Sequence, residues 1–194
     1  MNFQENFNNH SKQYIFSNDN YLSKERQKIF NKINLNKFDK KNNESLKNIS
    51  ISDLNSFNYF YEPSKEKPNI EISEKNIYQI NLVNGKCPDY KDENIQIRNI
   101  LIKDIELFKS NNQKNTNDIV ADLNLIFLNS GIFIDVNERS KIKICLNYKA
   151  EKDYTIFQHN FFNFLKNSEV IIEENFYLTE NTISNIYNNI NIEE

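Results

Sequence analysis

The sequence has two histidines and two cysteines, residue types that can serve as metal ligands or catalytic groups: His10, His159, Cys87 and Cys145. A metal site needs several such ligands close together, and a catalytic base must lie within hydrogen-bond reach of its target. His159 stands among aromatic residues in "TIFQHNFFNF", and Cys145 alternates with apolar residues in "KIKICLNY". These patterns favour a partly buried strand histidine and a strand thiol. His10 is interpreted as a surface residue, and Cys87 as a second structural thiol.

The adjacent carboxylates Glu173 and Glu174, in "VIIEENF", are candidates for acid–base chemistry. Consecutive strand residues point to opposite faces, so these two cannot act as a pair on one bond. The sequence also lacks the motifs G-x-S-x-G, G-x-G-x-x-G, H-E-x-x-H and C-x-x-C, and it has no P-loop. We therefore predict that the chain is not an enzyme, and we assign no catalytic, cofactor-binding or metal-binding residue. An enzyme that uses His159 and Glu174 is a third hypothesis, with little in the sequence behind it.

The composition suits one good-sized domain or two small ones, with 194 residues, of which 38% are hydrophobic. A net charge of −3 provides no basic field for nucleic acid. Two cysteines make no disulfide framework, which fits a reducing cytosol. The first residues do not resemble a signal peptide, and no apolar stretch approaches the ~20 residues of a membrane span. We expect a soluble cytoplasmic protein that binds neither nucleic acid nor membrane.

Helical spacing of apolar residues occurs in the first two thirds of the chain. An amphipathic helix is predicted over residues 21–35, with Ser23 as its N-cap. A short helix is predicted over residues 50–61, and a strand leading into a helix over 95–108. A further helix is predicted after Asp118. Residues 1–20 are expected to be a loosely held polar tail.

Strand patterns dominate the rest of the sequence. Residues 77–85 alternate between apolar and polar and end in Asn84–Gly85, which predicts a strand and a turn. Gly131 is expected to end a helix in a left-handed conformation. After it, short alternating segments predict strands around residues 132–136, 142–146, 162–164, 170–172 and 190–192. Such strands suit a sandwich, a barrel or a β-solenoid, and periodicity does not choose among these.

Four segments, taken in order, resemble the N-terminal half of the SufD family of iron–sulfur cluster assembly proteins. In "NESLKNISISDLNSF" (43–57), Glu44, Lys47 and Leu54 match a family segment that reads Glu-x-Trp-Lys-Tyr-Thr before a leucine, although Leu46 and Asn48 replace its Trp and Tyr. The other segments are "IYQINLVNGKC" (77–87), "DLNLIFLNSGIFIDV" (122–136) and "NSEVIIEENFYLTEN" (167–181). The resemblance covers residues 20–194, and the order of the segments carries it.

This resemblance implies an α+β fold, with an N-terminal, mainly helical domain followed by the first coils of a truncated right-handed parallel β-helix. The expected organisation is a polar tail over residues 1–20, a helical domain with a short strand over 21–130, and the start of the β-helix over 131–194. The family's cluster-handling Cys and His positions lie beyond the matched part, so none is carried over to Cys145 or His159. We expect an N-terminal fragment or a shortened homologue.

The function implied by the resemblance is that of a non-catalytic scaffold subunit of the SufBCD iron–sulfur cluster assembly complex. It would form a heterodimer with a SufB-like protein through the β-helix and would bind no cofactor itself. The SufC ATPase would be reached only through a C-terminal domain that this sequence lacks. An unfinished solenoid would also expose a strand edge for a partner. The alternative is a stand-alone β-rich binding or structural domain unrelated to iron–sulfur chemistry, which closed sheet edges would favour.

Overall fold

The computed structural model describes residues 3–10, 14–34, 65–112, 119–151, 154–179 and 182–193. The chain divides into two units, each assembled from two stretches of sequence. The first unit is Met1–Tyr59 with Leu101–Asn129, and it holds all of the described helices. The second unit is Phe60–Ile100 with Ser130–Glu194, and it holds all of the described strands. The helix predicted over residues 50–61 and the matched segment 43–57 lie outside the described residues.

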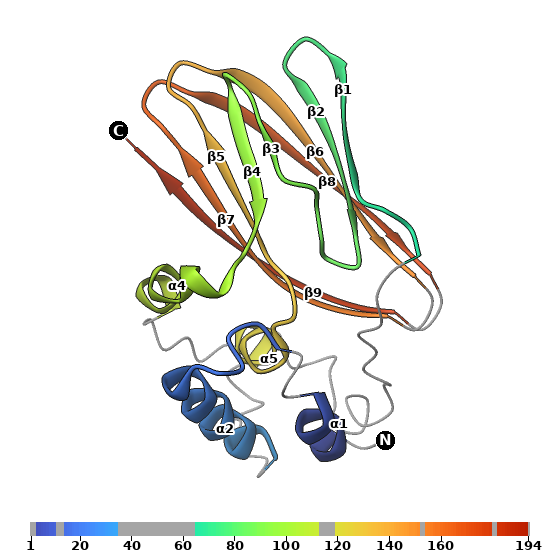
Figure 1. Cartoon of the computed structure of the whole chain (residues 1–194), viewed down its shortest axis with the longest axis vertical. Helices are drawn as coiled ribbons and strands as arrows, with labels where there is room; N and C mark the ends of the chain where they lie inside the picture. Colours follow the sequence, from blue (N-terminus) through green and yellow to red (C-terminus); the bar gives the residue numbers. More distant parts are fainter. Residues whose placement is uncertain are drawn as a thin grey trace, which may run out of the picture. The chain divides into compact units, whose positions relative to one another are not determined.

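The helices of the first unit are short (Figure 1). None of those described has the length and apolar character that crossing a bilayer requires. The elements are α1 (Phe3–His10), α2 (Asn20–Asn34), the 3₁₀ turn η3 (Ile102–Asp104), α4 (Ile105–Asn112) and α5 (Ile119–Phe127).

Helix α2 confirms the amphipathic pattern found in the sequence. Leu22, Arg26 and Phe30 recur at helical spacing and are all buried. The N-cap is Asp19 and not the predicted Ser23, because the Asp19 carboxylate accepts a hydrogen bond from the Leu22 amide at 2.8 Å. Arg26 tolerates burial because its guanidinium donates to two backbone carbonyl groups.

Aromatic packing holds the first unit together. Phe7, on α1, stacks on Phe30, with ring centroids 4.3 Å apart. Tyr14 meets Phe127, on α5, edge to face at 5.9 Å. Residues 1–20 were expected to form a polar tail, yet α1 and Tyr14 supply buried aromatic rings to this core.

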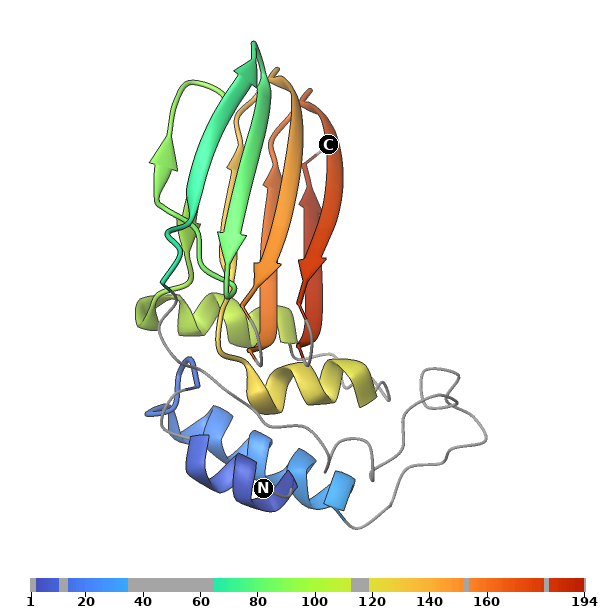
Figure 2. The ribbon, with the colours of Figure 1, turned by 90° about the vertical axis from the view of Figure 1, so that its right-hand side faces the viewer.

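Two sheets make up the second unit (Figure 1). Figure 2 shows the successive strands side by side, from the green hairpin to the red C-terminal strands. The first sheet has the order β1 (Asn69–Glu74), β2 (Ile77–Val83), β6 (Lys141–Ala150), β8 (Glu169–Leu178). The second has the order β3 (Tyr90–Lys91), β4 (Ile95–Asn99), β5 (Ile132–Val136), β7 (Thr155–Phe164), β9 (Ile183–Ile192).

Apolar side chains from both sheets form one core. Ile80 and Ile144 come from the first sheet, and Ile97 and Phe162 from the second. Each of the four is no more than 1% exposed. The alternation read from the sequence is therefore the alternation between the core side and the outer side of each strand.

From β5 onward the chain alternates between the two sheets. From β7 onward each strand pairs in parallel with the strand two places before it. Every such pair joins residues that are 28 positions apart, as in Ile144 with Ile172 and Phe162 with Ile190. At several of these positions side chains of similar kind meet. Phe133 stacks on Phe161 at 4.8 Å, for example.

The expected fold class is wrong. Residues 69–99 belong to the stretch predicted as an N-terminal helical domain, but they form β1 to β4. The pairs β1–β2, β3–β4 and β4–β5 are antiparallel, so the described strands form two mixed sheets and not a right-handed parallel β-helix. The physical reason is that alternation identifies a strand without specifying the direction of its partner.

Several individual elements are confirmed. Strand β2 occupies the segment predicted from residues 77–85, and Asn84–Gly85 makes its turn, with φ values of 50° and 77°. Two backbone hydrogen bonds between Val83 and Lys86 close this turn. Helix α5 and the strands predicted after residue 131 are also present.

Gly131 does not have the predicted left-handed conformation, since the only described glycine with a positive φ is Gly85. Its role is steric. A Cβ atom at Gly131 would overlap the side chain of Ile100 and the backbone carbonyl oxygen of His159. The Ile100 amide donates to the Gly131 carbonyl at 2.8 Å, so the two backbones are held close. Glycine is needed here for close approach, not for a left-handed turn.

Replacing Gly131 tests this steric role. Gly131→Ala is expected to lower the free energy of unfolding by about 1–3 kcal/mol, because the added methyl group must displace Ile100 or the backbone of β7. Denaturant unfolding measures the effect, with Glu138→Ala in the exposed turn after β5 as the control. Gly131→Asn should be at least as damaging as Gly131→Ala. A milder effect of Asn would instead support the left-handed role.

Candidate functional site

His159, the leading sequence candidate, is enclosed in β7 and only 2% exposed. Its ring stacks on Phe161 with centroids 4.6 Å apart, and it lies 4.8 Å from the ring of Tyr187, its register partner on β9. Burial lowers the pKa of His159 to about 3, so the imidazole is neutral at physiological pH. In the described part of the chain, no three His, Cys, Asp or Glu side chains gather to hold a metal ion. The side chain of His10 lies outside the described residues.

Both cysteines are free and buried, at 4% exposure for Cys87 and 3% for Cys145. The Cys87 amide donates to Asn99 Oδ1 at 3.1 Å, and Asn99 Nδ2 donates back to the Cys87 carbonyl at 2.6 Å. Burial raises the pKa of the Cys87 thiol to about 12. A protonated thiol is a poor nucleophile and a poor metal ligand, so this environment suits a structural role for Cys87.

Glu173 and Glu174 contact different groups. Glu173 forms an ion pair with Lys143 at 2.7 Å. Glu174 accepts hydrogen bonds from the Tyr148 hydroxyl at 2.8 Å and from Asn188 Nδ2 at 3.1 Å. The carboxylates are therefore held by separate partners, which is the arrangement expected of neighbours on opposite faces of a strand.

A hydrogen-bonded polar cluster connects the inner faces of the two sheets. Gln158 donates to Asn160 at 2.6 Å, and Asn160 donates to the Tyr148 hydroxyl at 3.0 Å and to Asn188 at 2.9 Å. Tyr148 in turn donates to Glu174. Burial and the nearby Glu174 carboxylate raise the pKa of Tyr148 well above its usual value, so its hydroxyl stays a donor. The cluster runs from fully buried Gln158 and Asn160 to exposed Glu174 and Asn188.

The sequence analysis missed this cluster, although a signal for it exists. Asn160 and Asn188 are 28 residues apart, as are Asn147 and Asn175 on the outer side of the first sheet. Asn175 Nδ2 donates to Asn147 Oδ1 at 3.1 Å, and Asn147 Nδ2 donates to Asn81 Oδ1 at 3.1 Å. The recurrence of asparagine at this interval in the sequence is the signal for both pairs.

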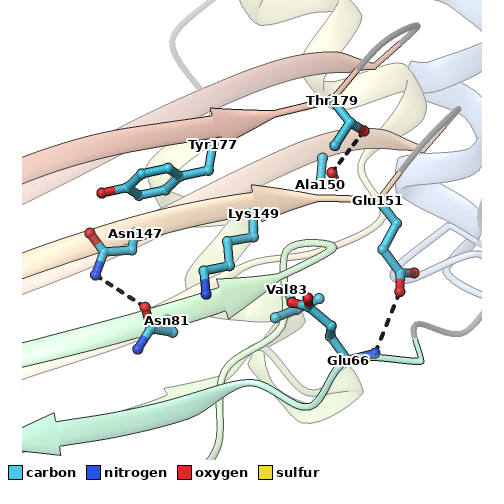
Figure 3. A pocket seen from close by; sticks show the side chains of 9 residues that line it. All are labelled: Glu66, Asn81, Val83, Asn147, Lys149, Ala150, Glu151, Tyr177 and Thr179. Atoms are coloured by element: carbon cyan, nitrogen blue, oxygen red, sulfur yellow. Dashed lines mark hydrogen bonds between the residues drawn. The ribbon is translucent and has the colours of Figure 1, made fainter.

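A hollow of about 670 Å³ lies on the outer side of the first sheet (Figure 3). Its Glu151 carboxylate accepts hydrogen bonds from the backbone amides of Lys65 and Glu66 and from the side chain of Asn84. These bonds hold neighbouring segments together. The nine described residues that line it include no histidine or cysteine, so the hollow does not assemble a nucleophile with a base. They are Glu66, Asn81, Val83, Asn147, Lys149, Ala150, Glu151, Tyr177 and Thr179.

The most distinctive surface is the open end, which we define as strands β8 (169–178) and β9 (183–192). Each is the last strand of its sheet among the described residues. Both are ten residues long. Most of the exposed large apolar side chains of the described part lie on them: Ile171, Phe176, Tyr177, Leu178, Tyr187, Ile190 and Ile192.

Part of this apolar surface continues the core. Phe176 stacks on Tyr148 at 4.9 Å but remains 52% exposed. Ile190 and Ile192 pair in register with the buried residues Phe162 and Phe164, yet they are 53% and 68% exposed. The interior of the two-sheet structure is therefore open to solvent at this end.

In comparisons with known proteins, the chain matches no family model, no curated protein and no solved structure. The proposed function below is therefore argued from the geometry.

The buried imidazole predicts a dependence of stability on pH. The unfolded chain binds a proton at His159 as pH falls through 6.5, whereas the folded chain resists protonation down to about 3. Stability from the neutral ring is thus fully present above pH 6.5 and is lost as pH falls toward 3. When pH falls from 7 to 5, the free energy of unfolding should decrease by about 2 kcal/mol less in His159→Phe than in the unmodified chain. Denaturant unfolding at both pH values measures this.

Phenylalanine is the matched replacement because it preserves the stack with Phe161 and Tyr187. Between pH 7 and pH 8 the two proteins should show the same change in stability. Equal losses between pH 7 and pH 5 would mean that the folded chain does protonate His159 in this range.

Proposed function

We propose that this chain is a non-catalytic scaffold domain that binds another protein by adding strands at its open end. The observation that carries the proposal is the pair of long edge strands, β8 and β9, with exposed apolar side chains. An edge strand presents unpaired backbone donors and acceptors, and a partner strand can satisfy them. Exposed apolar area of this kind is typical of protein-interaction sites.

The other ends of the two sheets differ in a way that supports this proposal. Proteins protect free edges with short strands, bulges, charges and prolines. Strand β3 has only two residues, and β1 has an irregular register between Ile72 and Glu74. Neither β8 nor β9 contains a Lys, a Pro or a Gly. The open end therefore lacks the short strand and the irregular register of the opposite edges, and its charges are the carboxylates of β8.

The environments of the candidate chemical groups also fit a binding role. His159 and Cys87 are enclosed and uncharged, and the hollow beside Glu151 holds no nucleophile–base pair. The resemblance to SufD names the first partner to test, a SufB-like protein. On this proposal the chain supports iron–sulfur cluster assembly by pairing with that protein and binds no cluster itself.

Co-expression of the chain with the SufB and SufC proteins of its own organism tests the proposal. The tagged chain is expected to retain the SufB-like protein through purification. Ile190→Lys/Ile192→Lys should abolish retention, because two ammonium groups would face the apolar contact. Asn189→Lys/Asn191→Lys, on the opposite face of the same strand, is the matched control and should retain the partner.

Two results would contradict the proposal. Retention that persists in Ile190→Lys/Ile192→Lys would place the contact elsewhere on the chain. A folded monomer that retains no partner would favour the alternative of a stand-alone β-rich domain.

A further inference from the structure

The contact between β6 and β8 indicates which side chains a further strand would need in order to pair with the free edge of β8. The residues of β8 pair in register with residues 28 positions earlier, and several neighbouring side chains are complementary. Lys141 forms an ion pair with its register partner Glu169 at 2.6 Å, and Lys143 forms one with Glu173, which lies diagonally from it, at 2.7 Å. Beside them lie the amide pair Asn147–Asn175 and the stacked rings of Tyr148 and Phe176.

Charge at the open end has one sign. Strand β8 contains Glu169, Glu173 and Glu174 and no Lys or Arg, and β9 contains no charged residue. Like charges on directly opposite strand residues are destabilising, whereas opposite charges stabilise the pair. A strand that adds to β8 is therefore favoured if it places Lys or Arg next to Glu169 and Glu173.

A second copy of this chain does not meet that requirement. Its own β8 would bring the same carboxylates, and its β1 edge carries Glu71 and Glu74, so both contacts would set acidic strands side by side. Its β9 edge carries no charge, and its β3 edge has two residues with one lysine, Lys91. The charge pattern thus favours a different protein over self-association.

The hydrogen-bonded asparagines Asn81, Asn147 and Asn175 indicate which hydrogen-bonding group the partner must supply. Asn147 donates to β2 and accepts from Asn175 of β8. Asn175 donates to Asn147 of β6 and to Glu173 of its own strand. If the arrangement of Asn147 repeats, Asn175 Oδ1 would accept a hydrogen bond from the strand that follows. A partner residue at this position must be a hydrogen-bond donor, and asparagine would continue the ladder.

We propose that the open end binds a strand of a different protein that runs parallel to β8 and repeats the side-chain pattern of β6. This strand carries Lys or Arg beside Glu169 and a second Lys or Arg beside Ile171, diagonal to Glu173. It carries an amide beside Asn175 and an aromatic ring beside Phe176. The inference rests on the proposed function, because it specifies the partner of the same surface.

The probe for the test is a labelled peptide with the sequence of residues 141–150, in which Cys145 is replaced by Ser. A second peptide has Glu in place of Lys141 and Lys143. In fluorescence anisotropy titrations, the full chain is expected to bind the lysine peptide about tenfold more tightly than the glutamate peptide. Added salt should reduce this difference.

Charge exchange in the chain provides the decisive comparison. Glu169→Lys/Glu173→Lys should reverse the preference and bind the glutamate peptide more tightly. Glu71→Lys/Glu74→Lys, which reverses two charges on β1, is the matched control and should leave the preference unchanged. If Glu169→Lys/Glu173→Lys does not fold, Glu169→Gln/Glu173→Gln serves instead and should remove the preference.

Equal binding of both peptides, or binding of neither, would overturn the charge inference. The proposed function is tested separately, by whether the chain retains the SufB-like protein and whether Ile190→Lys/Ile192→Lys abolishes this retention. Self-association of the chain without binding of the lysine peptide would also overturn the inference, because a second copy would then be the occupant.

Discussion

Parallel pairing of residues 28 positions apart is the interaction on which the second unit depends. It brings each strand from β7 onward against a strand with matching side chains, so rings stack on rings and amides bond to amides. The stacks of Phe133 on Phe161 and of Tyr148 on Phe176 follow from it. The same pairing leaves β8 and β9 as neighbouring edges, because they are the last described strands of their sheets.

An open stack of this kind differs from a closed sandwich because apolar side chains on its last strands remain exposed to water. Buried positions such as Phe162 and Phe164 have already lost their contact with water, whereas their partners Ile190 and Ile192 have not. Covering these residues would recover about 25 cal/mol for each Å² of apolar surface removed from water. The same step would enclose Glu174 and Asn188, which are exposed members of the inner polar cluster. A partner must therefore satisfy polar groups as well as bury apolar ones.

The reactive residue types serve this packing. His159 stacks on Phe161 and contacts the ring of Tyr187, Cys87 exchanges hydrogen bonds with Asn99, and Glu173 pairs with Lys143. Tyr187, Asn99 and Lys143 each belong to another strand than the group that they contact. These environments give the histidine, Cys87 and Glu173 structural partners.

The local elements could be predicted from the sequence. Alternation identified β2 and the strands after residue 131, helical spacing identified α2 and α5, and Asn84–Gly85 identified a turn. These features depend on residues close together in the chain. The direction of strand pairing, which gives two mixed sheets in place of the expected β-helix, depends on the tertiary structure, and so does the close approach that requires Gly131. The hydrogen bond from buried Asn160 to exposed Asn188 and the exposure of Ile190 do so too, because such contacts depend on which distant strands become neighbours.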